Sequence, residues 1–183
     1  MTHEDTDSAA ARLSEIAAYF REHPVTGPLE GHATTVTAAA PMRIGTLDYL
    51  TATVREVADH TRTANPDAGP LPERLQDVYT WMREHTEHAP EDVQVRADAI
   101  EYRQWLEHCL EAGDHETVRR QVRQQPCPKC GCWGLMWMQE QREAYCTNPE
   151  CTDRDGFSTH LSLARLAHVH ATANRKVRQA RAT

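Results

Sequence analysis

Residues 126–151 read Pro-Cys-Pro-Lys-Cys-Gly-Cys-Trp-Gly-Leu-Met-Trp-Met-Gln-Glu-Gln-Arg-Glu-Ala-Tyr-Cys-Thr-Asn-Pro-Glu-Cys, and this stretch decides the local fold. It holds two cysteine pairs, Cys127-x2-Cys130 and Cys146-x4-Cys151, separated by 15 residues. Zinc in structural sites takes four thiolates in a tetrahedron at about 2.3 Å. A redox Cys-x-x-Cys pair would need a βαβ context that is missing here. The spacing therefore predicts one structural Zn²⁺ held by Cys127, Cys130, Cys146 and Cys151.

The segment between the two pairs is expected to form a β-hairpin. Gly131 suits the left-handed backbone of a tight turn after the first pair. Trp133, Leu135 and Trp137 alternate with other residues at the two-residue period of a strand, and residues 142–145 return to the second pair. We expect the two tryptophans to anchor this small unit to the rest of the protein, with stacking on nucleic-acid bases as the alternative.

Three further residues bear on the metal site. Cys132 is interpreted as a small strand residue or a neighbour of the site, with replacement of Cys130 as a ligand left open. His160 is interpreted as a surface or interface histidine, and its use as a substitute ligand is also left open. Cys109 falls on an apolar helical stripe and is expected in the core.

These cysteine motifs resemble a known family. Cys127-Pro-Lys-Cys-Gly followed by Cys146-Thr-Asn-Pro-Glu-Cys resembles a zinc ribbon, and its second half is similar to the Ogr/Delta-type zinc fingers of phage transcription activators. The match covers about residues 127–157, with a shorter intervening loop. A helical region, a ribbon and a basic helix in this order also resemble zinc-ribbon proteins of actinobacteria and their phages, and 18 Arg against 2 Lys fit a high-GC genome. Ribbons contact DNA, RNA, polymerase and proteins alike, so the resemblance implies metal binding rather than one function.

The C-terminal region is predicted to add a strand and a helix. A turn at 153–156 precedes a third strand at 157–161, and Ser162 caps a helix over 163–180. Its expected buried face consists of Leu163, Leu166, Ala167, His170, Ala173 and Val177. The candidate nucleic-acid-binding residues are the cations of this region, Arg165, Arg175, Lys176, Arg178 and Arg181. The alternative is a solvated helix whose cations favour its own dipole.

The N-terminal two-thirds is predicted to be helical. Apolar residues recur at helical spacing, and breakers such as Asn65-Pro66 and Gly113 separate the segments. The expected helices span 9–22, 46–63 (capped by Thr46), 71–88, 90–112 (ended by Gly113) and 114–125 (capped by Asp114). Residues 24–45 are interpreted as a linker or long loop with a short strand at 34–37, and whether they are ordered is left open.

Within this region, residues 91–125 also have the outline of a helix-turn-helix. Its second helix carries Arg119, Arg120 and Arg123, which form a rival surface for nucleic acid.

Charge is distributed unevenly along the 183 residues. Residues 1–125 carry 12 Arg and 22 acidic residues, a net −10, whereas residues 126–183 stand at +3 and residues 156–183 alone at +5. Phosphate would be repelled by the first part and attracted by the last. There is no membrane-spanning run, and the acidic N-terminus lacks an apolar signal core, which indicates a cytoplasmic protein.

These observations predict a mainly α protein with a helical domain (1–125), a β zinc ribbon (126–161) and a basic C-terminal helix (162–183). The first two are expected to unfold separately. We expect a non-enzymatic, zinc-stabilised protein that binds nucleic acid or assists transcription or recombination, with DNA or that machinery as partner. The alternative is a protein–protein adaptor in which zinc is purely structural and the acidic helices bind a basic partner. A metal-dependent enzyme would need an open coordination position, which four thiolates close. The target, any recognised base sequence and the oligomeric state are left open.

Overall fold

The computed structural model describes residues 8–22 and 44–182, and the protein is mainly α. The helices are α1 (Ala9–Glu22), α2 (Ile44–Ala64), α3 (Val78–Thr86), α4 (Glu91–Glu111), α5 (His115–Arg123) and α6 (Leu163–Ala182). A short 3₁₀ helix, Leu75–Asp77, precedes α3. The strands are β1 (Leu135–Met138), β2 (Glu143–Cys146) and β3 (His160–Ser162). None of the described helices is long and apolar enough to cross a membrane.

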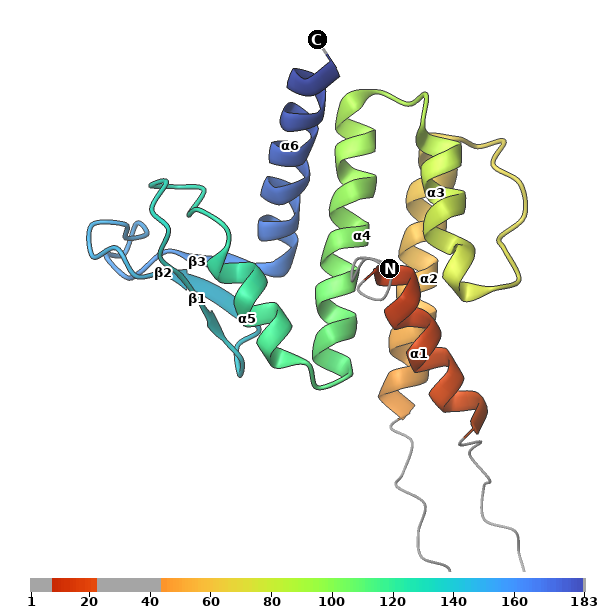
Figure 1. The fold of residues 1–183 in the computed structure, drawn as a ribbon, viewed down its shortest axis with the longest axis horizontal. Coiled ribbons are helices and arrows are strands. Elements are labelled where there is room, and N and C mark those ends of the chain that lie inside the picture. The colour runs from red at the N-terminus through yellow and green to blue at the C-terminus, as the bar shows by residue number, and fades with distance from the viewer. Residues whose placement is uncertain (1–7, 23–43, 183) are drawn as a thin grey trace, which may run out of the picture.

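Helix α4 stands at the centre of the molecule. Helices α1, α2 and α3 lie on one side of it, and α6 runs along its other side (Figure 1). Helix α5 turns back from the end of α4 and packs against β1. The three-stranded sheet therefore lies next to α5, and its strand β3 contacts α6 (Figure 1). The last helix of the chain is therefore part of the helical body.

Local signals set the ends of α4 and α5 as the sequence predicts. Pro90 is the N-cap of α4, and Gly113 has a φ of +80°, the left-handed conformation that ends a helix. Asp114 then caps α5, because its side chain accepts a hydrogen bond from the backbone N–H of Thr117. These three adjoining signals make the tight corner between α4 and α5.

Two N-terminal expectations are wrong in detail. Helix α2 begins at Ile44, so Thr46 lies inside the helix rather than capping it. The helix expected over 71–88 is helical only from Leu75, and its α-helical part ends at Thr86. The proline at 72 disfavours a helical conformation at Leu71, the first residue of the expected helix. The expected strand at 34–37, with most of the 24–45 linker, lies outside the described residues.

The C-terminal helix also differs from its expected pattern. Leu163, Leu166 and Ala167 are buried as expected, but Ala173 and Val177 are exposed. The buried apolar face ends at Ala171, because the contact with α4 beyond it is polar: Arg175 bonds Asp98 and Gln94, and Gln179 bonds Glu91. His170 stacks on Tyr102 of α4 with ring centroids 3.7 Å apart.

The sheet is antiparallel in the order β1-β2-β3. Leu135 pairs with Cys146, Trp137 with Ala144, and Ala144 with Leu161, so these residues share one face. The third strand is expected at 157–161, but β3 is shorter and begins later, at His160. One isolated bridge, between Thr152 and Ser158, precedes it.

The inner face of the sheet joins the core of the helical body. Val118 and Val122 of α5 are fully buried, and they belong to one continuous apolar cluster with Leu106 of α4 and Leu135 of β1. The predicted boundary at 125/126 falls between α5 and β1, whereas the one at 161/162 falls inside β3, and buried side chains from all three segments share this core. We call residues 126–161 the cysteine module.

Candidate metal centre

Four sulfur atoms meet at one end of the sheet. The Sγ atoms of Cys127, Cys130, Cys146 and Cys151 all lie within 4.8 Å of one another. The Cys127 and Cys151 sulfurs are 3.8 Å apart, and those of Cys130 and Cys146 are 3.6 Å apart. Four sulfurs about 2.3 Å from one tetrahedral ion would be about 3.8 Å from each other. The four cysteines can therefore hold a single metal ion, as the spacing predicts.

The first cysteine pair is shaped by a tight turn. The backbone N–H of Gly131 donates to the carbonyl of Cys127 at 2.8 Å, and the N–H of Cys127 donates to the carbonyl of Cys132 at 2.9 Å. Gly131 has a φ of +74°, which a side chain would strain. This turn directs Cys127 and Cys130 toward the same point.

The second pair is organised by Asn148. Its backbone N–H donates to the Cys146 sulfur, its carbonyl accepts from the N–H of Cys151 at 2.9 Å, and its side chain accepts from the N–H of Glu150 at 3.1 Å. The sequence motif contains Asn148, but only the structure shows that it supports both cysteines of the pair.

A close approach between Gly134 and Thr147 joins the start of β1 to the second pair. The Gly134 carbonyl accepts from both the N–H and the hydroxyl of Thr147, each at 2.9 Å. A Cβ at Gly134 would lie 2.5 Å from the Thr147 hydroxyl oxygen, so a side chain here would displace the Thr147 hydroxyl from its hydrogen bond.

The surroundings act differently on two of the thiols. The backbone N–H of Cys132, with smaller contributions from neighbouring side chains, lowers the pKa of Cys130 to about 6. Burial raises the pKa of Cys146 to about 12, because a thiolate loses hydration there. A cation placed among the sulfurs would stabilise the thiolate form of all four, which is the form that binds metal.

The three residues left open in the sequence now have positions. Cys132 lies outside the four-sulfur cluster, is exposed, and accepts a hydrogen bond from the Asn148 side chain at 3.6 Å. His160 lies on β3 and contacts Glu143 at 3.2 Å, away from the cluster. Cys109 is fully buried in the helical core, as expected.

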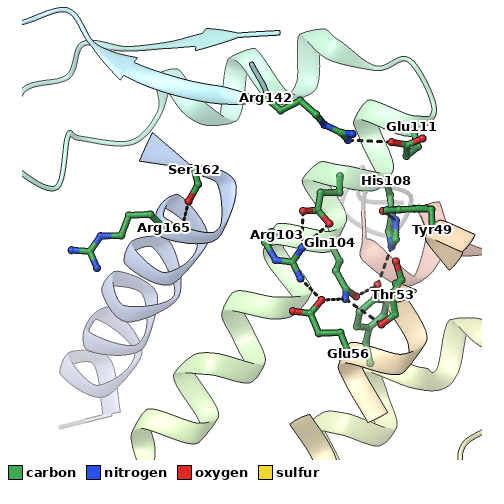
Figure 2. Close-up of polar contacts among 12 residues, drawn as sticks. Tyr49, Thr53, Glu56, Arg103, Gln104, His108, Glu111, Arg142, Ser162 and Arg165 are labelled. Atoms are coloured by element: carbon green, nitrogen blue, oxygen red, sulfur yellow. Dashed lines mark hydrogen bonds and ion pairs between the residues drawn. The ribbon is translucent and has the colours of Figure 1, made fainter. Parts of the chain in front are cut away.

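Polar contacts attach the cysteine module to the helices, among them those of Gln139 with Arg119 and His115 of α5. Arg142, in the β1–β2 turn, pairs with Glu111 at the end of α4 at 3.1 Å (Figure 2). The hydroxyl of Ser162 accepts from the backbone N–H of Arg165 at 3.3 Å and caps α6, as predicted (Figure 2). The module is thus held at the turn of its hairpin and at its exit into α6.

Its tryptophans have different roles. Trp137 packs partly buried against the core, as expected of an anchor. Trp133 precedes β1, and its side chain is 73% exposed, so the expectation that it anchors the module is wrong. The chain has not yet entered the strand at Trp133, so the strand alternation does not apply to it.

The five candidate cations of the last helix do not share one surface. Arg175 is partly buried and bonds Asp98 of α4 at 2.8 Å and Gln94 at 2.6 Å. Arg165, Lys176, Arg178 and Arg181 are exposed. At about 100° per residue, Arg165 and Lys176 lie on nearly the same side of α6, whereas Arg181 is about 140° away from Lys176.

Sequence reasoning missed a buried polar chain in the helical body. Tyr79 donates its hydroxyl hydrogen to Gln104 at 2.8 Å, so its oxygen accepts from Nε2–H of His108 at 2.9 Å. Nδ1 of His108 then accepts from the hydroxyl of Tyr49 (Figure 2). Burial, with a smaller contribution from the charge of Arg103, lowers the pKa of His108 to about 4. This chain joins α2, α3 and α4, and no local motif predicts it.

The same chain continues toward solvent. Gln104 donates through Nε2 to the carbonyl of Thr53 and to the carboxylate of Glu56, which also pairs with Arg103 (Figure 2). Arg103 pairs in turn with Glu107 at 2.6 Å. The described contacts thus satisfy the polar atoms of Gln104 and both ring nitrogens of His108, which favours a structural role.

Comparison with protein-family models, with curated proteins and with solved structures gave no match for this chain.

Proposed function

We propose that this chain is a zinc-stabilised protein-binding protein, in which the cysteine module presents the contact surface. Four thiolates at tetrahedral separations are a donor set typical of structural zinc. They complete the coordination shell and leave no position for a substrate or a reactive water. This argues for a structural ion and for a non-enzymatic role.

The identity of the ion has a direct test. Protein purified without added metal should contain one zinc per chain by elemental analysis. A stoichiometric amount of iron would show that the four cysteines hold iron, as in a rubredoxin-like centre, and not zinc. The absence of both metals would contradict the proposal that a metal stabilises the module.

The exposed aromatic side chains of the module carry the proposal. The described residues include four large apolar side chains that are exposed, and three of them are in the module: Trp133 (73%), Phe157 (72%) and Met136 (36%). Trp133 lies three residues after Cys130, on backbone that a bound metal would help to hold in place. Exposed aromatics on a rigid support are typical of the residues that contribute most to protein–protein binding.

Charge favours a protein partner over nucleic acid. The module has three cations and five carboxylates, a net −2, and four thiolates around a divalent ion add two further negative charges. Lys129 donates to the carbonyl of Thr152, and Arg142 pairs with Glu111, so two of its cations are engaged. Phosphate would be repelled from this surface, whereas a partner with an apolar pocket and a basic rim would be attracted.

The helices offer limited support for the nucleic-acid alternative. Arg175 is bound to Asp98, and the exposed cations of α6 are spread around the helix. On α5, Val118 and Val122 are buried in the core that the helix shares with the sheet. Of the three arginines of α5, Arg119 contacts Gln139 of the module, whereas Arg120 and Arg123 are exposed. The observation that favours nucleic acid is Trp133 itself, because an exposed indole also stacks on unpaired bases.

A paired experiment separates the two functions. Tagged wild-type protein, a Trp133→Ala/Phe157→Ala double variant and a Val177→Ala control are used to capture proteins from cells of the source organism. Val177 is the matched control because it is an exposed apolar residue on α6, half exposed and outside the module. A protein retained by the wild type and the control, but lost from the double variant, is the expected result.

The nucleic-acid arm uses the same three proteins. Binding to single-stranded and duplex oligonucleotides is measured at about 50 and about 300 mM salt, where phosphate contacts weaken steeply. We expect weak binding at most, lost at the higher salt. Tight oligonucleotide binding that the double variant loses would overturn the protein-binding proposal and establish base stacking instead.

A further inference from the structure

A cavity in the helical body lies between α4 and α6. Its volume is about 450 Å³, which is within the range of small-molecule binding sites. Residues of α4 and α6 supply most of its lining, and the start of α1, α3 and α5 contribute the rest. The cysteine module supplies none of the described lining residues, so the cavity is separate from the candidate metal centre.

The lining of this cavity includes a row of packed rings. Tyr102 of α4 contacts Trp105 with ring centroids 5.5 Å apart, and it stacks on His170 of α6 with centroids 3.7 Å apart. Trp105 is only 8% exposed, and its buried indole N–H has no hydrogen-bond partner within the described part of the chain. Ala171 is buried beside these rings in the lining. The aromatic side chains and the alanine offer a preformed surface for a flat apolar group.

The charged groups around the cavity are unevenly paired. Arg83 donates to both carboxylate oxygens of Glu101, at 3.0 and 3.2 Å, and Arg175 bonds the carboxylate of Asp98 at 2.8 Å. Arg178 lines the cavity close enough to Glu101 for their charges to interact, but among the described residues it forms no ion pair or hydrogen bond. Three arginines thus accompany two carboxylates, and the guanidinium of Arg178 is the group left for a ligand.

An adjoining hollow indicates on which side of Arg178 an anion would bind. This hollow of about 300 Å³ shares Arg83, Asp98 and Arg178 with the cavity. It is also lined by Glu84 and Glu87, which are exposed carboxylates that would repel an anion. The carboxylates that line the cavity are both engaged with arginines. An anion paired with Arg178 is therefore favoured on the side of the aromatic rings.

We propose that the cavity binds a small aromatic carboxylate, whose ring packs against Trp105 and Tyr102 and whose carboxylate pairs with Arg178. A guanidinium and a carboxylate form two parallel charge-assisted hydrogen bonds. One unpaired guanidinium matches the single charge of a carboxylate, whereas a phosphate monoester carries about −1.5 to −2. The inference is independent of the metal and of the partner proposed for the module.

The test measures binding of hydrocinnamate to the intact chain at low salt by isothermal titration calorimetry. Wild type, Arg178→Gln and Arg181→Gln are compared. Arg181 is the matched control because it is also an exposed arginine near the end of α6, but it does not line the cavity. We expect wild type and Arg181→Gln to bind equally and Arg178→Gln to bind at least about tenfold more weakly. Both residues are exposed, so neither substitution should disturb the fold.

Two further probes separate the ring from the charge. Hydrocinnamamide keeps the ring and lacks the charge, whereas acetate keeps the charge and lacks the ring. Each should bind at least about tenfold more weakly than hydrocinnamate, because each makes only one of the two contacts. In a nitrogen–proton NMR spectrum, hydrocinnamate should shift the indole N–H signal of Trp105 and leave that of the exposed Trp133 in place.

Several results would overturn the proposal. Absence of hydrocinnamate binding at about 10 mM would show that the cavity does not take this class of ligand. Equal affinity of wild type and Arg178→Gln, or of hydrocinnamate and its amide, would show that Arg178 does not bind the carboxylate. A shift at Trp133 without one at Trp105 would place the molecule on the cysteine module instead.

Discussion

Each sulfur of the four-cysteine cluster is positioned by contacts within a few residues of it. The turn at Gly131 directs the first pair, and Asn148 supports the second. Because binding needs all four thiolates, the loss of one should cost far more than the loss of a neighbouring thiol. Cys132 lies two residues after Cys130 but outside the cluster, so it should contribute little to metal affinity.

Serine substitutions test this distinction. Cys146→Ser is expected to lower zinc content well below one per chain, because an alcohol is a poor zinc ligand and Cys146 is buried. Cys132→Ser should keep one zinc per chain. Elemental analysis of the two purified proteins is the measurement, and full occupancy in Cys146→Ser would refute the assignment of the ligands.

At the same scale, His108 makes the helical body sensitive to acid. Its pKa in the folded state, about 4, lies below the ordinary 6.5, so protonation favours the unfolded chain. The contribution of neutral His108 to the free energy of unfolding is fully present above pH 6.5 and is lost as the pH falls toward 4. The total loss is about 3 kcal/mol. Urea unfolding of wild type should show this loss between pH 6.5 and 4.

His108→Gln provides the comparison. Glutamine does not titrate, so the free energy of unfolding of this variant should fall less over the same pH interval. Metal loss and the titration of Glu101 and Glu107 affect both proteins alike. The difference between the two pH profiles therefore reports the titration of His108 alone. Parallel profiles for the two proteins would show that His108 is not the titrating group.

At the scale of elements, the last helix is positioned by pairing with α4. Arg175 and Asp98 have side chains only 21% and 23% exposed, and their ion pair joins residues 77 positions apart. The neighbouring Lys176 is exposed. Two adjacent cations of α6 therefore have different roles, one inside the helix–helix contact and one facing solvent.

Alanine substitution of these neighbours should separate the roles. Arg175→Ala is expected to lower the free energy of unfolding by about 1–2 kcal/mol, because it leaves Asp98 without its partner in a partly screened site. Lys176→Ala should change it by less than about 0.5 kcal/mol. Urea titration measures both, and equal effects would mean that the pairing of α6 with α4 contributes little.

At the scale of the whole molecule, one core runs from the helices into the sheet. Leu135 of β1 and Cys146 of β2 belong to the same buried cluster as Val118 and Val122 of α5. Helix α6 leaves the sheet directly at Ser162 and returns to α4. The four-cysteine cluster therefore lies in the segment that connects α5 with α6, and loss of a metal bound there should reach beyond the module.

Metal removal tests this coupling. A strong chelator should change tryptophan fluorescence and also lower the melting temperature of the helical circular-dichroism signal, since the shared core loses the inner face of the sheet. The separate unfolding expected from the sequence would leave that melting temperature unchanged. Re-addition of zinc is the control, and it should restore both signals.

The sequence by itself determined the features that depend on near neighbours. The cysteine spacing predicted the four-sulfur cluster, because turns of three to six residues decide where such sulfurs point. Gly113, Asp114 and Ser162 marked helix ends correctly, since caps act within one turn. Thr46 failed because a residue of capping type is also tolerated inside a helix, so its position alone does not fix a boundary.

Only the tertiary structure decided which side chains face solvent and which cations are engaged. Trp133 and Trp137 are alike in the sequence pattern, yet one is exposed and the other packs on the core, because the strand begins between them. In the sequence, Arg175 belongs to a basic tail. In the structure, α6 lies along α4, and Arg175 forms an ion pair with Asp98. The chain linking Tyr49, Tyr79 and His108 likewise joins three helices. Such contacts connect residues far apart in the chain, where no local rule of spacing or propensity applies, and packing of the whole core selects them.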